Sequence, residues 1–435
     1  MKRAKPESSS PCNKELLHSN PKRLKYLAQE EDYNYNLLNL SDDVLLNIFK
    51  YLSSFDLLSL HLCCLRLCDL CRDRTLWKSI DLRGKHLPFD ELKEYVKFLQ
   101  PVTKFLALRG NKRKNELPEL MLSFLKIINK KCTQLEDFIL EEYSISREKI
   151  QITNFPTTLK KLSLQSSQLL KGNIVQVEKS YLYKIDDHMP NLTTLILTNC
   201  DWLNSHSFIA ISKIRNLKEV RLNSCHGLDE EIAYASLACR YGLKSLELLD
   251  LRDTFVGDSV ISSFSHTSTL TEMYLECPGD ETAPHPPNDN LQLIEQNPEH
   301  RYIVFQDNQI AMVNENEYNH LFRNIVNNAD RFQVSDRSLC TLGLCSNENN
   351  EEIINLREEV QLVQGRARTL TNPKLKKLVV RNYAGVTNQT LLHFTVNGRE
   401  LKYLDVTGTS VTKEGLQNFK LQRPDVTIIS SFEEI

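Results

Sequence analysis

Four cysteines stand close together near the front of the chain, where thiolates could hold a metal ion. Cys63, Cys64, Cys68 and Cys71 include one C-x-x-C pair, a spacing that zinc sites use. No second C-x-x-C follows at the spacing of a zinc ribbon or a RING domain. On a helix, residues 64, 68 and 71 would share one face, as core residues do. We therefore expect structural thiols here and no metal.

Catalytic motifs are also missing from the sequence. It contains no G-x-x-x-x-G-K-[ST], no G-x-G-x-x-G, no G-x-S-x-G and no H-E-x-x-H. Thirteen glycines in 435 residues leave few positions for phosphate-binding loops. The sequence thus indicates a non-catalytic protein without a cofactor. An enzyme with a site hidden in residues 279–334 remains an alternative.

Composition and charge favour a soluble protein of the nucleus or the cytoplasm. The chain is 41% hydrophobic and 25% charged, and its net charge of −2 gives no reason to expect nucleic acid or a membrane as partner. No apolar run approaches the roughly 20 residues that span a bilayer. The basic N-terminus lacks the apolar stretch of a secretory signal. Lys22, Arg23 and Lys25 are either a nuclear import signal or part of a solvated tail.

The helices that must position these cysteines follow a polar tail. Residues 1–36 show little apolar pattern, and we expect them to be disordered. In residues 37–82, apolar residues become frequent and recur at helical spacing. Ser41 is a suitable N-cap for a first helix, and Asp56 for a second. We expect the whole stretch to be helical and too apolar to stand without a partner surface.

From about residue 100 a different pattern begins, with the template L-x-x-L-x-L-x-x-(N/C). Most start-to-start spacings are between 24 and 29 residues, within the range of leucine-rich repeats. The copies begin at Leu135, Leu159, Leu192, Leu217, Leu246, Leu270, Leu339, Leu375 and Leu401, with a weaker one at Thr103.

The template predicts a short strand in every repeat. Positions four and six face the same way, so they form the core, and positions three, five and seven face the opposite surface. Position nine, occupied by Cys200 and Cys225, lies at the turn that leaves the strand. The resemblance to leucine-rich repeats implies that a buried polar or thiol side chain satisfies backbone groups there. Amphipathic segments between the strands read as helices. Since one unit cannot bury its apolar face alone, neighbours must stack into an α/β solenoid.

Two segments interrupt the repeats. Residues 279–334 separate a first block, 83–278, from a second block with a C-terminal cap, 335–435, and are either an insertion or a degenerate repeat. Within them we expect a hairpin around Asp307 and Asn308, and a helix over residues 316–329. Residues 350–364 are acidic and helix-prone.

The segment from Leu40 to Leu82 resembles the F-box, a helical module that docks on the S-phase kinase-associated adaptor of cullin-based ubiquitin ligases. The match departs from the family pattern at Ser41, Cys63 and Leu67. An unrelated helical cap on the solenoid is the alternative. The residues that fit the pattern are Leu40, Leu45, Ile48, Phe49, Leu52, Asp56, Leu57, Leu60, Cys64, Arg66, Leu70, Asp73, Leu76 and Trp77.

Together the two parts resemble the F-box/leucine-rich-repeat family, which implies a substrate-recognition subunit that links a protein target to the adaptor and a cullin–RING core. A non-degradative interaction scaffold or inhibitor is the alternative. For the surface and core of the F-box we predict Leu40, Leu45, Ile48, Phe49, Leu52, Leu57 and Trp77. For target binding on the exposed strand face we predict Arg221, Arg252, Tyr274, Glu276, Arg381 and Tyr403.

Overall fold

The computed structural model describes residues 36–85, 89–110, 116–170, 180–204, 206–228, 232–279, 292–297, 301–306, 309–314, 334–343 and 372–432. The chain forms two compact units, Met1–Tyr51 and Leu52–Ile435. In the described ranges no helix has the length and hydropathy needed to cross a membrane. Except for Asn36, the predicted tail of residues 1–36 lies outside the described residues.

The first unit contains a short 3-10 helix, η1 (Leu37–Asn39), and the helix α1 (Asp42–Phe49). Ser41 precedes α1 as predicted, but its side chain makes no capping hydrogen bond. Asp42 and Asp43 occupy the first turn, where the helix dipole favours negative charge.

The second unit begins with α2 (Ser54–His61), α3 (Leu65–Cys71) and the 3-10 helix η2 (Arg74–Trp77). The prediction that Asp56 caps the second helix is wrong, because Ser53 is the cap. The Ser53 hydroxyl accepts from the Asp56 N–H at 3.2 Å, and the Asp56 carboxylate accepts from the Ser53 N–H at 3.3 Å. This reciprocal pair is a capping box, which needs the acid at the third helical position.

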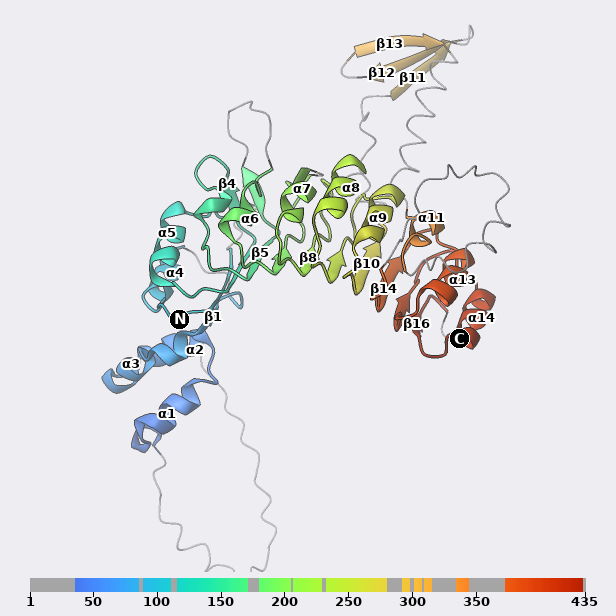
Figure 1. The fold of residues 1–435 in the computed structure, drawn as a ribbon. Coiled ribbons are helices and arrows are strands. Elements are labelled where there is room, and N and C mark those ends of the chain that lie inside the picture. Colours follow the sequence, from blue (N-terminus) through green and yellow to red (C-terminus); the bar gives the residue numbers. More distant parts are fainter. Residues whose placement is uncertain are drawn as a thin grey trace, which may run out of the picture. The chain divides into compact units, whose positions relative to one another are not determined.

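Eleven parallel strands form one sheet in sequence order, which confirms the predicted α/β leucine-rich-repeat solenoid (Figure 1). The expectation that residues 37–82 are entirely helical is wrong, since the first strand lies within them. The strands are β1 (Ser79–Asp81), β2 (Phe105–Arg109), β3 (Asp137–Glu141), β5 (Lys161–Gln165), β7 (Thr194–Ile196), β8 (Glu219–Arg221), β9 (Leu248–Asp250), β10 (Glu272–Glu276), β14 (Lys377–Arg381), β15 (Tyr403–Asp405) and β16 (Thr427–Ile429).

Helices form a second layer, and successive ones pack on each other from α6 to α14. Leucines at positions four and six of the template fill the space between the layers; Leu195 and Leu197, for example, are fully buried. A small parallel pair, β4 (Ser144–Ser146) and β6 (Gln168–Leu170), and the short helix η3 (Ile152–Asn154) lie outside the main sheet. The layer consists of α4 (Phe89–Val96), α5 (Leu122–Lys131), α6 (Ile185–His188), α7 (His206–Ser212), α8 (Ile232–Tyr241), α9 (Asp258–Ser263), η4 (Phe264–His266), α11 (Asp336–Leu339), α13 (Asn388–Asn397) and α14 (Lys413–Gln422).

The template copy that begins at Leu339 is not a strand, which corrects the sequence prediction. Leu339 ends the helix α11, and β10 pairs directly with β14 in the sheet. Leu339 and Leu342 are both buried, and their spacing of three fits one face of a helix as well as it fits the template. Residues between β10 and β14 therefore add a helix to the outer layer and no strand to the main sheet.

The same stretch contains a separate antiparallel sheet. The predicted hairpin is confirmed, because β12 (Arg301–Gln306) pairs with β13 (Gln309–Asn314) around residues 307–308. A third strand that the sequence did not predict, β11 (Gln292–Asn297), pairs with β12. The expected helix at 316–329 and the acidic segment 350–364 lie outside the described residues.

Hydrogen bonds join α11 to the helices before and after it. Asp258, in the first turn of α9, accepts from the Ser335 N–H at 2.7 Å. Asp336, the first residue of α11, accepts from the N–H groups of Thr387 at 2.9 Å and Thr390 at 3.2 Å. The hydroxyl groups of Ser335, Thr387 and Thr390 donate to the same carboxylates. Each helix N-terminus is thus satisfied partly by the preceding repeat.

The turn that leaves each strand shows a regularity that the sequence did not reveal. Position nine behaves as predicted, since the thiol groups of Cys200 and Cys225 donate to the carbonyl oxygens of Leu164 and Leu197, each at 2.8 Å. Position eight adopts a left-handed conformation, although it is usually not glycine. The residues with positive φ at this position are Glu142, Ser166, Asn199, Ser224, Asp253, Asn382 and Gly408.

Trp77 joins the helical module to the first repeat within the second unit. Its side chain is fully buried, and its indole N–H donates to the Cys71 carbonyl oxygen at 2.7 Å. The indole stacks on the Phe98 ring with centroids 4.2 Å apart. The Thr103 hydroxyl, just ahead of β2, donates to the Trp77 carbonyl oxygen at 2.8 Å. The position of α2 and α3 therefore depends on this indole.

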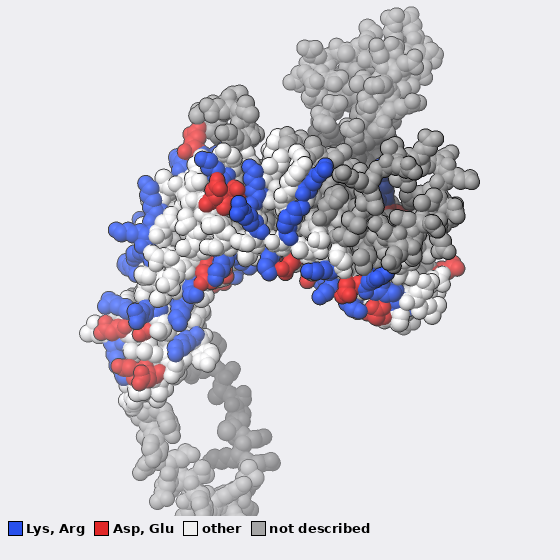
Figure 2. All heavy atoms as spheres, in the orientation of Figure 1, with Lys and Arg blue, Asp and Glu red and all other residues white. Residues whose placement is uncertain are grey.

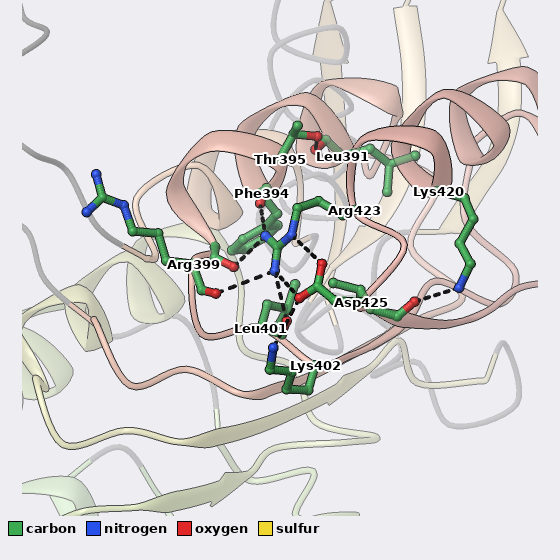
Figure 3. Close-up of polar contacts among 11 residues, drawn as sticks. Leu391, Phe394, Thr395, Arg399, Leu401, Lys402, Lys420, Arg423 and Asp425 are labelled. Carbon is green, nitrogen blue, oxygen red and sulfur yellow. Dashed lines mark hydrogen bonds and ion pairs between the residues drawn. The ribbon is translucent and has the colours of Figure 1, made fainter.

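At the other end of the solenoid, Arg423 closes the C-terminus of α13 (Figure 3). Its guanidinium donates to the carbonyl oxygens of Gly398 at 2.7 Å and Leu401 at 3.0 Å, and its side chain is only 13% exposed. Asp425 accepts from the same guanidinium at 2.9 Å. Arg423 first, and then Lys402, hold the pKa of the Asp425 carboxyl below its usual range. One side chain thus satisfies the last carbonyl groups of a helix.

Replacing Arg423 with alanine should lower the free energy of unfolding by about 1.5–3 kcal/mol, because buried carbonyl oxygens would lose a charged donor. Urea unfolding followed by circular dichroism would measure the change. Arg423→Lys should recover little, since an ammonium cannot replace the planar fork. Arg399→Ala is the control, because this exposed side chain points away from the cluster (Figure 3). Equal stability of the Arg423 and Arg399 variants would contradict this role.

Trp77→Ala should lower the free energy of unfolding by about 3–5 kcal/mol, the usual cost of removing a buried tryptophan. The matched control is Leu62→Ala, at a side chain that is 78% exposed, and its effect should stay within about 0.5 kcal/mol. The same unfolding experiment compares the two. A Trp77 variant as stable as the Leu62 variant would show that the indole does not hold the helices on the first repeat.

Candidate protein-binding surfaces

The first unit exposes large apolar side chains on one side of α1. Val44 and Ile48, one turn apart, are 44% and 40% exposed, while Leu45 and Phe49 are buried. A helix with two apolar faces has more apolar surface than one core can cover. In the same unit, exposed apolar residues also include Leu37, Leu38, Leu40 and Tyr51.

The second unit has exposed leucines around the start of α3. Leu62 and Leu65 are 78% and 85% exposed, whereas Leu57 and Leu67 of the same helices are buried. These helices rest on the first repeat through His61 as well as Trp77, since the His61 ring meets the Phe98 ring edge-on at 5.1 Å. Contact with the repeats therefore leaves the two leucines uncovered within this unit.

Burial divides the predicted F-box residues into two groups, which the sequence could not do. Four of the seven form core and cannot offer a surface to a partner, because they are at most 3% exposed: Leu45, Phe49, Leu57 and Trp77. Leu52 is half-buried, and Leu40 and Ile48 are exposed. The sequence prediction did not include Val44, Leu62 and Leu65, although the spacing of Val44 from Ile48 indicated a shared face.

Of the three cysteines predicted to share one helix face as core residues, only Cys71 is buried, while Cys64 and Cys68 are half-buried. Cys64 precedes α3 as its N-cap, Cys63 is exposed, and Cys71 is buried. Burial raises the pKa of the Cys71 thiol to about 11, which keeps it protonated. Among the described residues, no group of three or more metal-ligating side chains is found.

The six predicted target-binding residues come together on one face of the sheet. Five of them lie within β8, β10, β14 and β15, and Arg252 follows the end of β9 by two residues. All six are half-buried, as expected for side chains that stand on the outer surface of a sheet. Figure 2 shows basic and acidic groups interspersed along this edge of the molecule. The residues are Arg221, Arg252, Tyr274, Glu276, Arg381 and Tyr403.

Two aspartates that face the same surface are completely buried. The Asp250 carboxylate accepts from Arg252 at 2.7 Å and lies 3.5 Å from Arg221, with its side chain 0% exposed. Asp405 accepts from the Arg381 guanidinium at 2.6 Å and is also 0% exposed. These neighbours raise the pKa of Arg252 and of Arg381. The arginines therefore cover buried carboxylates, and some of the N–H groups of each guanidinium already donate to these carboxylates.

Aromatic rings and cations alternate beside these ion pairs. The Lys377 ammonium lies 5.1 Å from the Tyr274 ring centroid and 4.8 Å from that of Tyr403. Arg252 lies 5.4 Å from the same Tyr274 ring. The Tyr274 hydroxyl donates to Glu272 at 2.5 Å, and burial together with this bond raises the Tyr274 pKa. Such contacts hold cations in fixed positions over the ring faces.

A polar hollow of about 440 Å³ lies where these strands end. Its lining includes Asn223, Arg252, Asp253, Glu276 and Asn382, from four successive repeats. Amide, carboxylate and guanidinium groups surround it, so it fits polar side chains of a protein ligand better than an apolar molecule.

Comparison with known proteins supports both parts of the structure. Residues 38–83 match the F-box-like family. Human F-box/LRR-repeat protein 12 is 26% identical over 239 residues, which cover 53% of this chain and 68% of the human protein. The mouse F-box/LRR-repeat protein 12 is 25% identical over 237 residues, with the same two coverages of 53% and 68%.

Two solved structures match the chain with low TM-scores. The Rad7–Elc1 complex of yeast matches with 15% identity, a TM-score of 0.37, and coverage of 82% of this chain and 77% of the other. A leucine-rich-repeat protein of Leptospira interrogans matches with 16% identity, a TM-score of 0.28, and coverage of 77% and 86%. TM-scores this low add nothing to what the strand pairing already shows. An F-box-like segment, a parallel leucine-rich sheet and the similarity to F-box/LRR-repeat protein 12 agree, and together they support the predicted resemblance to the F-box/LRR-repeat family.

Proposed function

We propose that this chain is the substrate-recognition subunit of an SCF-type E3 ubiquitin ligase. In this proposal the F-box binds the S-phase kinase-associated adaptor protein and through it a cullin–RING core. The repeats bind a protein target, which the ligase marks for proteasomal degradation. The observation that carries the proposal is an F-box-like segment that keeps large apolar side chains exposed after its own core is complete.

The exposed side chains favour a protein partner over a purely structural role. Val44 and Ile48 present an apolar face on α1 in addition to the one that the helix buries. Leu62 and Leu65 stay exposed although α2 and α3 already rest on the first repeat. Exposed apolar patches of this kind mark interaction sites in soluble proteins. An unrelated helical cap would be expected to bury its apolar side chains against the solenoid.

Recruitment requires no catalytic residue in this chain. Holding a target lysine near a charged conjugating enzyme raises the transfer rate by proximity alone. We therefore propose that the chain is non-catalytic and binds no cofactor, no nucleic acid and no membrane. We also propose that it works in the nucleus, the cytoplasm or both, where cullin-based ligases would meet it.

The double variant Val44→Asp/Ile48→Asp should lose co-purification of the adaptor and cullin by roughly tenfold or more, since two charges would enter an apolar interface. The measurement is affinity purification of the full chain with cullin activity blocked. Leu421→Asp is the matched control, because this α14 leucine is 81% exposed and lies far along the chain from the F-box. Thermal unfolding of both variants should match the wild type.

Each outcome of this experiment has a defined meaning. Undiminished recovery of the adaptor by the double variant would overturn the proposal. If the adaptor is recovered but the half-lives of bound targets do not change when the chain is removed from cells, the chain is a non-degradative scaffold or inhibitor instead.

A further inference from the structure

The outward face of strands β8 to β15 carries four cations, and three of them are already paired. Arg221 and Arg252 both approach the buried Asp250, and Arg381 binds the buried Asp405. A carboxylate that is 0% exposed needs its counter-charge in the folded state, so these arginines cannot leave it at low cost. Their contribution to the face is therefore mainly structural.

Lys377 differs from the three arginines. Its ammonium lies over the Tyr274 and Tyr403 rings, at 5.1 and 4.8 Å from their centroids, and it forms no ion pair with a carboxylate of the described residues. The lysine is half-buried, so part of its hydration is already replaced by the two ring faces. An aromatic face holds a cation in place but does not neutralise its charge.

The two acids closest to Lys377 by strand pairing have other partners. Glu272 lies opposite Lys377 in the register of β10 and β14, but its carboxylate accepts from the Tyr274 hydroxyl at 2.5 Å. Glu276 lies opposite Arg381, four residues further along the same strands. Its charge acts on the guanidinium groups of Arg381 and Arg252. Neither acid forms an ion pair with the Lys377 ammonium.

We propose that Lys377, held between Tyr274 and Tyr403, is the contact that selects the target: it takes a single carboxylate from an acidic side chain of the bound protein. This inference rests on the proposed function, which makes this face the target-binding surface. The half-buried position gives the pair more weight than a fully exposed one.

The charges around Lys377 indicate whether its ligand is a single carboxylate or a polyanion. Against four cations this face carries five carboxylates, which would repel a nucleic acid or a multiply phosphorylated segment. One acidic side chain brings a single negative charge and therefore meets less of that repulsion than a polyanion does. The four cations are Arg221, Arg252, Lys377 and Arg381, and the five acids are Glu219, Asp250, Glu272, Glu276 and Asp405.

The test uses the full chain in complex with its adaptor and three pools of immobilised random peptides. The pools are identical except that one residue is fixed as glutamate, glutamine or lysine. Wild type should retain the glutamate pool about fivefold better than the glutamine pool, and added salt should reduce the difference. Lys377→Glu should reverse the preference in favour of the lysine pool. The matched control is Lys376→Glu, which places the same charge on an exposed neighbour.

The readouts separate this inference from the proposed function. Both lysine variants should co-purify the adaptor as well as wild type does, because the F-box is unchanged. If the preference of the Lys377 variant equals that of the Lys376 variant, or if wild type does not distinguish glutamate from glutamine, the inference is overturned while the ligase assignment stands. Loss of the adaptor from wild type itself would instead count against the proposed function.

Discussion

The structure depends on backbone hydrogen bonds between successive parallel strands, which no repeat can satisfy by itself. Each strand is only three to five residues long and pairs with the strands of the neighbouring repeats. Pairing sets the register, and the register places leucines of adjacent repeats in one continuous core. The same register brings side chains from distant parts of the sequence together on the opposite face. The register of the strands therefore determines both the residues of the core and the residues that share the opposite face.

The interactions near the two ends of this sheet differ in kind. At the start, Trp77 and Phe98 join helices to the first repeat and bury the apolar edge. In the last described repeat, Arg423 supplies charged donors to the carbonyl groups that follow α13 in the preceding repeat. Terminal units of repeat proteins must differ from internal ones. The contacts at the first repeat are thus mainly apolar, while those in the last described repeat are mainly polar.

The strand positions were predictable because alternation within a strand and a repeat of fixed length reinforce each other. Prediction failed at Leu339, where the spacing of three that fits the template fits a helix equally well. The left-handed position eight was hidden because Glu142, Ser224 and Asp253 are not the glycines that signal it. Sequence patterns also could not show that Asp250 is buried, because its cover comes from arginines whose placement only the fold defines. Likewise, helical spacing identified the apolar residues of the F-box but not which side of each helix remains exposed.

The helix α11 has a consequence for how the chain can vary in length. It is bonded to α9 through Asp258 and to α13 through Asp336, and the strands on either side of it pair directly with each other. Hydrogen bonds to the neighbouring helices hold α11 in the stack. Lengthening the peptide link before or after α11 costs only loop-closure entropy, which grows slowly with length. Evolution can therefore add or enlarge a module at this point, such as the β11–β13 sheet, without disturbing the main parallel sheet.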